Sequence, residues 1–279
     1  MIPTIPLNDN HQLPMIGMGV YQLATEAQMK TSVNAALEAG CRLFDTASMY
    51  RNEDLLGKVL ASSGVPREEL FLTSKVWNNA QRMGDVRGAF LRSLERLQTD
   101  YLDLYLIHWP VPGFYTETWK ELEQLREEGL VRSIGVSNFS VLQLEHLAQS
   151  SDTVPAVNQV EFHPLWNRRD LKEYCNAKGI ALQAYAPLAR GAYADRELLE
   201  NIGGNHGKTA AQTGLRWLIQ QNIAIIPRSS KPRRIRENLD ILDFSLSEKE
   251  MKTIDILDES FRSSNPPEDL RGLDLDRMV

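Results

Sequence analysis

The chain of 279 residues has little cysteine, no excess of positive charge and no long hydrophobic run. Its two cysteines, Cys41 and Cys175, fall in segments typical of buried elements, so we expect small buried side chains and no disulfide. The formal net charge of -6 disfavours a general nucleic-acid binder or a protein drawn to anionic membranes. No apolar run approaches the roughly 20 residues that a membrane-spanning helix needs.

Signals for export and for metal binding are also lacking. Residues 1–6 have neither the basic region nor the apolar region of a signal peptide. No Cys/His spacing indicates a metal site. The sequence therefore predicts a cytoplasmic protein without a metal ion and without nucleic-acid or membrane partners.

What the chain does contain is a regular alternation of strand-like apolar runs with amphipathic helical patterns. Eight such runs are followed by helical patterns, at a spacing of about 30 residues for most units. The runs lie at 16–21, 42–45, 70–75, 103–108, 134–138, 156–161, 180–185 and 224–227. This alternation predicts an α/β fold, a single (β/α)8 TIM barrel over residues 1–279, with a doubly wound open sheet as the main competitor.

Three further segments lie outside these eight units. Residues 5–7 and 12–15 flank a polar turn and predict a short β-hairpin that closes the barrel bottom, which an open sheet would not need. Helical patterns near 195–203 and 247–257 are expected to pack outside the barrel.

The strand ends carry groups whose chemistry is complementary. Asp45, Lys75 and His108 end three successive strands, and Tyr50 follows in the loop after the first of them. A lysine ammonium beside a tyrosine lowers the pKa of the phenol, an aspartate can neutralise the lysine, and a histidine can orient a substrate oxygen. These four groups predict a proton donor for a carbonyl oxygen. The hydride that completes a reduction implies a nicotinamide cofactor.

Other strand ends suit such a cofactor. Ser137, Asn138 and Gln159 can hydrogen-bond a carboxamide, and Tyr185 can offer a ring face to a pyridine. The last strand runs into a basic cluster at the start of a helix, which is an anion site suited to a phosphate and favours NADPH over NADH. This cluster comprises Arg228, Ser229, Ser230, Lys231, Arg233 and Arg234.

Each of these residues also has a plainer interpretation. Asp45 alone could cap a helix, Tyr50 could be a packed loop residue, Lys75 could be solvated and His108 could be a core histidine. The basic cluster could be a solvated helix face. Trp77, Trp109 and Tyr21 could be core aromatics, but their position at strand ends favours the walls of a substrate pocket.

The motifs together resemble those of the aldo-keto reductases. The matching stretches are 40–47 with Tyr50, Asn52 and Glu53, then 106–110, 135–139 and 226–238. Short loops make the chain most similar to the bacterial branch of 2,5-diketo-D-gluconate reductases. The resemblance covers about residues 5–257 and implies a (β/α)8 barrel that reduces carbonyl groups with NADPH.

The resemblance also implies roles for single residues. The catalytic tetrad falls on Asp45, Tyr50, Lys75 and His108, and substrate contacts on Tyr21, Tyr50, Trp77, His108 and Trp109. Cofactor contacts fall on Gly19, Val20, Tyr21, Ser137, Asn138, Gln159, Tyr185, Pro187, Leu188, Arg228, Ser229, Ser230, Arg234, Glu237 and Asn238. Arg228 stands where the family usually has lysine, and Ala186 stands where a serine often precedes the proline. The tail, residues 260–279, is expected to cross the barrel mouth.

The sequence thus predicts a monomeric NADPH-dependent enzyme that reduces aldehyde or ketone groups of small molecules, with Tyr50 as the proton donor. Two alternatives stay open at this stage. One is a cofactor-binding regulatory protein on the same barrel, without turnover. The other is a barrel isomerase or aldolase that acts on a sugar phosphate through Lys75.

Overall fold

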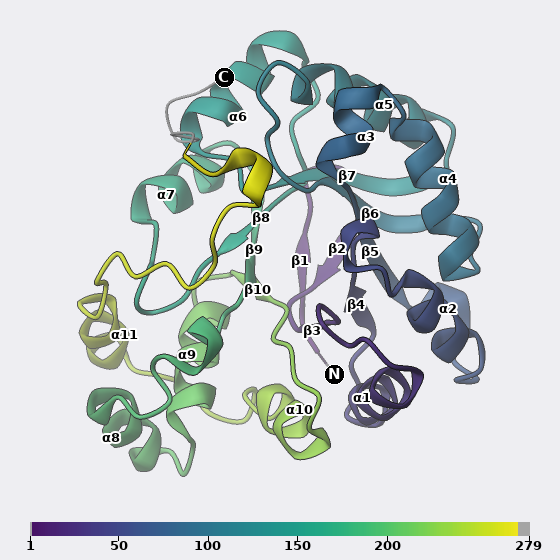
Figure 1. Ribbon diagram of the computed structural model, residues 1–279. Helices are drawn as coiled ribbons and strands as arrows, with labels where there is room; N and C mark the ends of the chain where they lie inside the picture. Colours follow the sequence, from purple (N-terminus) through teal and green to yellow (C-terminus); the bar gives the residue numbers. More distant parts are fainter. Residues whose placement is uncertain (1, 273–279) are drawn as a thin grey trace.

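A computed structural model describes residues 2–272 and shows a barrel of eight parallel strands (Figure 1). The strands are β3 (Gly17–Gly19), β4 (Leu43–Asp45), β5 (Phe71–Val76), β6 (Leu102–Ile107), β7 (Val131–Ser137), β8 (Val157–Glu161), β9 (Ala181–Tyr185) and β10 (Ala224–Ile225). They pair in sequence order, and the Ile225 N–H closes the ring by donating to the Met15 carbonyl at 2.8 Å. The predicted (β/α)8 fold is confirmed.

Helices surround the strands on the outside (Figure 1). They are α1 (Glu26–Glu38), α2 (Glu53–Ala61), α3 (Asn78–Met83), α4 (Val86–Leu97), α5 (Tyr115–Glu127), α6 (Val141–Ser150), α7 (Arg169–Ala177), α8 (Glu197–Asn205), α9 (Ala210–Ile219), α10 (Pro232–Leu239) and α11 (Glu248–Asp255). Short 3-10 turns lie at Ser48–Tyr50, Arg67–Glu69, Ala189–Gly191 and Glu268–Leu270. The segments predicted near 195–203 and 247–257 are α8 and α11.

Local sequence explains where several helices begin. Capping boxes form at Ser140, Thr209 and Ser247, where each side-chain oxygen accepts the backbone N–H three residues on. The Gln or Glu at that third position returns a bond to the cap. Helix α3 was not predicted, because it directly follows β5 and its six residues are too few to show a helical period.

The predicted hairpin is present as β1 (Thr4–Pro6) and β2 (Gln12–Pro14), which pair antiparallel. Leu7 and Leu13 are buried in one apolar cluster with Leu43, Phe71 and Leu104 from three barrel strands. Burying this apolar surface stabilises the fold and fills the barrel end away from the strand C-termini. The hairpin lies behind the barrel in the view of Figure 1.

Three further expectations concern the cysteines, membrane-spanning helices and metal sites. Cys41 and Cys175 are both buried and free. Across residues 2–272, no helix combines the length and the apolar character needed to cross a membrane. The same residues hold no group of three or more His, Cys, Asp or Glu side chains arranged to bind a metal ion.

Candidate active site

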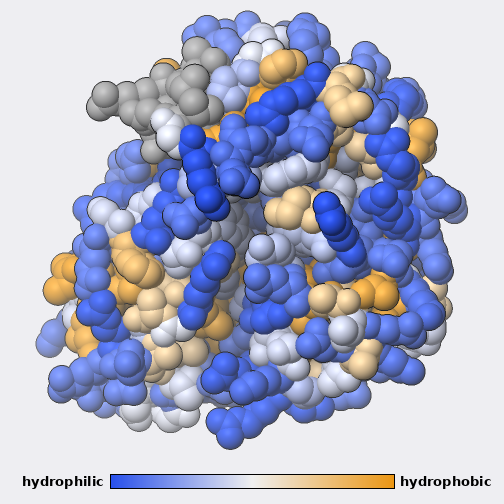
Figure 2. Space-filling model, in the orientation of Figure 1, coloured by the Kyte–Doolittle hydropathy of each residue, from blue (hydrophilic) through white to orange (hydrophobic). Residues whose placement is uncertain are grey.

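A cavity of about 910 Å³ opens at the C-terminal ends of the strands. Figure 2 shows a hollow near the centre of this face, with hydrophilic side chains around it. The cavity runs from Asp45, Tyr50 and His108 at one end to Arg234 and Asn238 at the other. Its size is in the range that small-molecule and cofactor sites occupy.

Asp45 and Lys75 form a buried ion pair beneath the cavity. Lys75 Nζ donates to Asp45 Oδ1 at 2.6 Å, to the Thr46 carbonyl at 2.7 Å and to the Tyr50 hydroxyl at 3.4 Å. The side chain of Lys75 is 0% exposed and that of Asp45 is 2% exposed. Burial lowers the pKa of Lys75 and raises the pKa of Asp45, and the attraction between the two charges opposes both changes.

Tyr50 lies between this ion pair and the cavity, in the 3-10 turn after β4. Burial raises the pKa of its phenol well above 10, and the negative charge of Asp45 adds to the rise. The net pKa of Tyr50 is therefore raised rather than lowered, because burial, with the charge of Asp45 added, outweighs any lowering by the nearby Lys75. Tyr50 is held in its protonated form, which is the form that can donate a proton.

His108 follows directly after β6 and packs edge-on against two rings of the cavity. Its ring centroid lies 5.6 Å from that of Tyr50 and 5.0 Å from that of Trp77. Burial, and then the positive charge of Lys75, lower the pKa of His108 well below 6.5. The imidazole is therefore neutral at neutral pH and can donate one N–H to an oxygen in the cavity.

The residues predicted to bind a carboxamide come together but already bond to the protein. Asn138 donates to the His108 carbonyl at 3.0 Å and accepts from the Tyr185 hydroxyl at 2.7 Å. Ser137 donates to the Gln159 carbonyl, and Gln159 Nε2 donates to Asp45 Oδ2 at 2.7 Å. An amide oxygen has two lone pairs, so Asn138 can still accept a further bond from a ligand.

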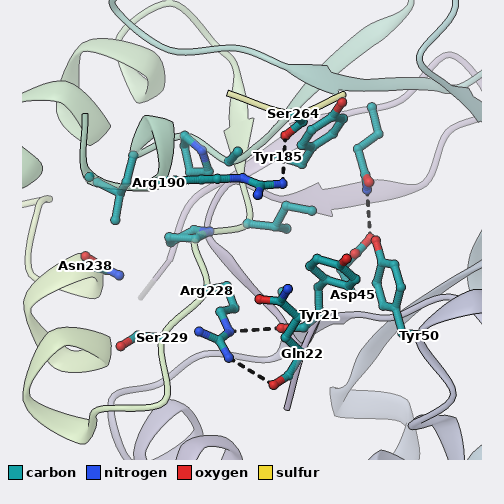
Figure 3. A pocket seen from close by; sticks show the side chains of 18 of the residues that line it. Tyr21, Gln22, Asp45, Tyr50, Tyr185, Arg190, Arg228, Ser229, Asn238 and Ser264 are labelled. Carbon is teal, nitrogen blue, oxygen red and sulfur yellow. Dashed lines mark hydrogen bonds between the residues drawn. The ribbon is translucent and has the colours of Figure 1, made fainter. Parts of the chain in front are cut away.

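At the other end of the cavity, the segment after β10 supplies cations at the start of α10. Ser229, Lys231, Arg233 and Arg234 all line this end, with Asn238 in the last turn of the helix. Arg228 differs from them: its Nε donates to the Tyr21 carbonyl at 2.9 Å and its Nη2 to the Gln22 carbonyl at 3.0 Å (Figure 3). The guanidinium thus joins the loop after β3 to the loop after β10.

Nearly all residues predicted from the sequence line this cavity. They are Gly19, Tyr21, Asp45, Tyr50, Trp77, His108, Trp109, Ser137, Asn138, Gln159, Tyr185, Pro187, Leu188, Arg228, Ser229, Ser230, Arg234, Glu237 and Asn238. Lys75 lies just beneath it, through its contacts with Asp45 and Tyr50. Val20 does not line it, because its side chain is fully buried in the main core and its carbonyl accepts from Asn52.

Sequence reasoning missed a group that attaches the tail to the barrel mouth. Glu161 ends β8, is 1% exposed, and accepts from the backbone N–H groups of Ser263 and Ser264 and from His163. Ser264 Oγ in turn accepts from Arg190, in the loop after β9, at 3.3 Å (Figure 3). The rule that identified Asp45, a charged residue at a strand end, could have identified Glu161 as well.

These contacts place part of the predicted tail at the mouth. Residues 264–267 and Arg271 line the cavity beside Trp77 and Trp109. Residues 273–279, the rest of the predicted tail, lie outside the described residues, as does residue 1 of the predicted single domain.

Comparison with known proteins agrees with this geometry. The model of the aldo/keto reductase family matches residues 15–259. A glyoxal reductase of Bacillus subtilis is 46% identical over 267 residues, which cover 96% of this chain and 97% of that protein. An aldo-keto reductase of Mycobacterium sp. (strain MCS) is 44% identical, covering 97% of this chain and 96% of that protein.

Solved structures have the same fold. The crystal structure of an aldo/keto reductase from Brucella melitensis has a TM-score of 0.89 and 41% identity, covering 92% of this chain and 100% of that chain. A Bombyx mori aldo-keto reductase in complex with NADP has a TM-score of 0.90 and 33% identity, covering 98% of this chain and 97% of that chain. The 2,5-diketo-D-gluconate reductase branch stays a prediction. The chain belongs to the aldo/keto reductase family.

Proposed function

We propose that this protein reduces aldehyde or ketone groups of small molecules to alcohols with NADPH. The observation that carries the proposal is the Tyr50 hydroxyl at the cavity, 3.4 Å from the ammonium of Lys75, which is itself paired with Asp45. Family membership supports carbonyl reduction with a nicotinamide cofactor, and the role of each side chain comes from its position.

Bound NADPH would supply the hydride for the carbonyl carbon. Tyr50, which is protonated at neutral pH, gives its proton to the carbonyl oxygen. Lys75 stabilises the negative charge that develops on the phenol oxygen, and Asp45 keeps the lysine charged in its buried position. Neutral His108 donates a hydrogen bond to the same carbonyl oxygen and orients it.

The side chains present suit the two ends of NADPH. Asn138, Gln159 and Tyr185 lie at the barrel end of the cavity, where the nicotinamide would bind. Lys231, Arg233 and Arg234 would bind the phosphates at the other end, where the N-terminus of α10 also favours an anion. This density of cations in a protein with a net charge of -6 favours NADPH over NADH.

The cavity walls favour a small substrate. Tyr21, Trp77 and Trp109 line the cavity together with Tyr50, and so do tail residues 264–267. The relative from Bacillus subtilis carries the name glyoxal reductase. We therefore infer that small aldehydes and α-dicarbonyl compounds are the substrates to test first.

The decisive experiment follows NADPH oxidation with glyoxal, other small aldehydes and keto-sugars. Wild type is compared with Tyr50→Phe, which retains the ring and its contact with Tyr21 at 4.8 Å but cannot donate a proton. We expect kcat to fall by about 100-fold or more in the variant, as is typical when a general acid is lost. Full turnover by Tyr50→Phe would contradict the proposed role.

The alternatives give different outcomes. A cofactor-binding regulatory protein would bind NADPH and turn over no carbonyl in the panel. An aldolase-type reaction requires the Lys75 amine to reach a substrate carbon, and borohydride trapping would detect the adduct. The structure disfavours this reaction, because Lys75 is 0% exposed and its three N–H groups already have partners.

A further inference from the structure

Arg228 stands out among the cations at the cofactor end of the cavity because its guanidinium is committed to another loop. Two of its five N–H donors bond the carbonyls of Tyr21 and Gln22, at 2.9 and 3.0 Å. No hydrogen bond of this kind links Arg233 or Arg234 to that loop in the part of the chain that the structure describes. Figure 3 shows Arg228 between Ser229 and Asn238 on one side and Asp45 and Tyr50 on the other.

The loop that Arg228 holds is strained and carries a wall of the substrate site. Gln22 has φ +61°, a left-handed conformation that is unfavourable for a residue with a side chain. A strained backbone persists only where its surroundings hold it. The ring of Tyr21, the residue before Gln22, packs on the Tyr50 ring with centroids 4.8 Å apart. The conformation of this loop therefore determines how Tyr21 contacts the proposed proton donor.

We propose that Arg228 is a positioning residue that clamps the loop after β3 and so fixes Tyr21 against Tyr50, whether or not it also contacts a cofactor phosphate. This inference rests on the proposed function and deepens it. The planar guanidinium presents its donors at a fixed spacing and so bonds two neighbouring carbonyls at once. Its three remaining N–H groups can still meet an anion.

The choice of arginine is therefore specific. A lysine offers one nitrogen on a flexible stem, so it retains the positive charge but does not reproduce the pair of bonds. Arg228→Lys therefore retains the positive charge of this residue and tests the contribution of its two hydrogen bonds to the Tyr21 and Gln22 carbonyls. Arg236→Met is the matched control, because Arg236 lies on α10 outside the cavity lining and pairs with Glu38, with no hydrogen bond to the Tyr21 loop within residues 2–272.

The kinetic test uses NADH, which has no 2′-phosphate. With NADH and glyoxal, we expect Arg228→Met to lower kcat/KM for the carbonyl substrate by about tenfold, as the loss of charge-assisted hydrogen bonds would. Arg228→Lys should recover only part of this loss, and Arg236→Met should change kcat/KM less than twofold. In a Tyr21→Ala background, Arg228→Met should have little further effect, since the clamp acts through Tyr21.

A second measurement does not depend on catalysis. Hydrogen exchange of the backbone amides of residues 20–24 in the cofactor-free protein should be faster in Arg228→Met than in wild type, and unchanged in Arg236→Met. Unchanged exchange together with unchanged NADH kinetics in Arg228→Met would overturn the clamp and leave Arg228 as a phosphate ligand only. If wild type reduced no carbonyl, the proposed function would fail, and the exchange measurement would still decide on the clamp.

Discussion

Replacing Lys75 by methionine should destabilise the protein strongly, because it leaves a carboxylate alone in the barrel interior. Asp45 is 2% exposed and would keep only the bond from Gln159 Nε2, at 2.7 Å. Removing one partner of a buried ion pair typically costs about 3–5 kcal/mol. We expect a loss of that size in the free energy of unfolding at pH 8, measured by urea denaturation.

The loss should depend on pH with a defined sign. Burial already raises the pKa of Asp45 above its ordinary 3.8, and Lys75 is the first group that opposes this rise. Without Lys75 the folded state therefore binds a proton more readily than the unfolded chain does, so stability increases as the pH falls towards 3.8. The deficit relative to wild type should therefore shrink as the pH falls from 8 towards 3.8.

A double variant provides the control. Asp45→Asn combined with Lys75→Met removes both charges, so it should be more stable at pH 8 than Lys75→Met alone and should lack the pH dependence. A deficit below about 1 kcal/mol at pH 8, or one that grows as the pH falls, would refute the assignment of an ionised buried pair.

Two further predictions concern His108 and Glu161. Because the pKa of His108 lies well below 6.5, its ring proton NMR signals should keep the positions of a neutral imidazole down to about pH 6, and titration near pH 6.5 would contradict this. Burial raises the pKa of Glu161, but hydrogen bonds from His163 and Ser263 outweigh burial and hold this pKa below 4.5. The contact between Glu161 and the tail should therefore persist at neutral pH and be lost only as the pH falls well below 4.5. Glu161→Gln should raise KM for the carbonyl substrate several-fold, because an amide N–H₂ would face the Ser264 N–H. Glu259→Gln, at an exposed position of the tail, serves as the control. Equal KM values in both variants would show that the Glu161 contact does not shape the site.

The positions of the strand ends could be predicted from the sequence because they depend on local pattern and strand direction. Apolar runs that stop at Asp45, Lys75 and His108 have to present these residues at one edge once the strands are parallel. Lys75 proved to be one residue inside β5 and His108 one residue beyond β6, a shift that leaves their side chains at the same edge.

Contacts between distant loops could not be predicted in this way. Arg228 meets the Tyr21 carbonyl across 207 residues of sequence, and Glu161 meets Ser263 across 102. Such contacts depend on which loops the closed barrel brings together, and a local sequence pattern does not indicate this. The direction of the Tyr50 pKa shift could not be predicted for a related reason: it depends first on burial and then on the charge of Asp45, and the sequence does not give the depth of burial.

The hairpin at the barrel bottom has a consequence for proton traffic. Leu7 and Leu13 join Leu43, Phe71 and Leu104 in an apolar cluster at the barrel end away from the strand C-termini. Such a cluster offers few polar groups to bind water, so we expect a proton lost from Tyr50 to be replaced from the cavity that Tyr50 lines. Reprotonation of the tyrosine would then be tied to the opening of the mouth after product leaves, so one entrance would serve both the carbonyl compound and the proton.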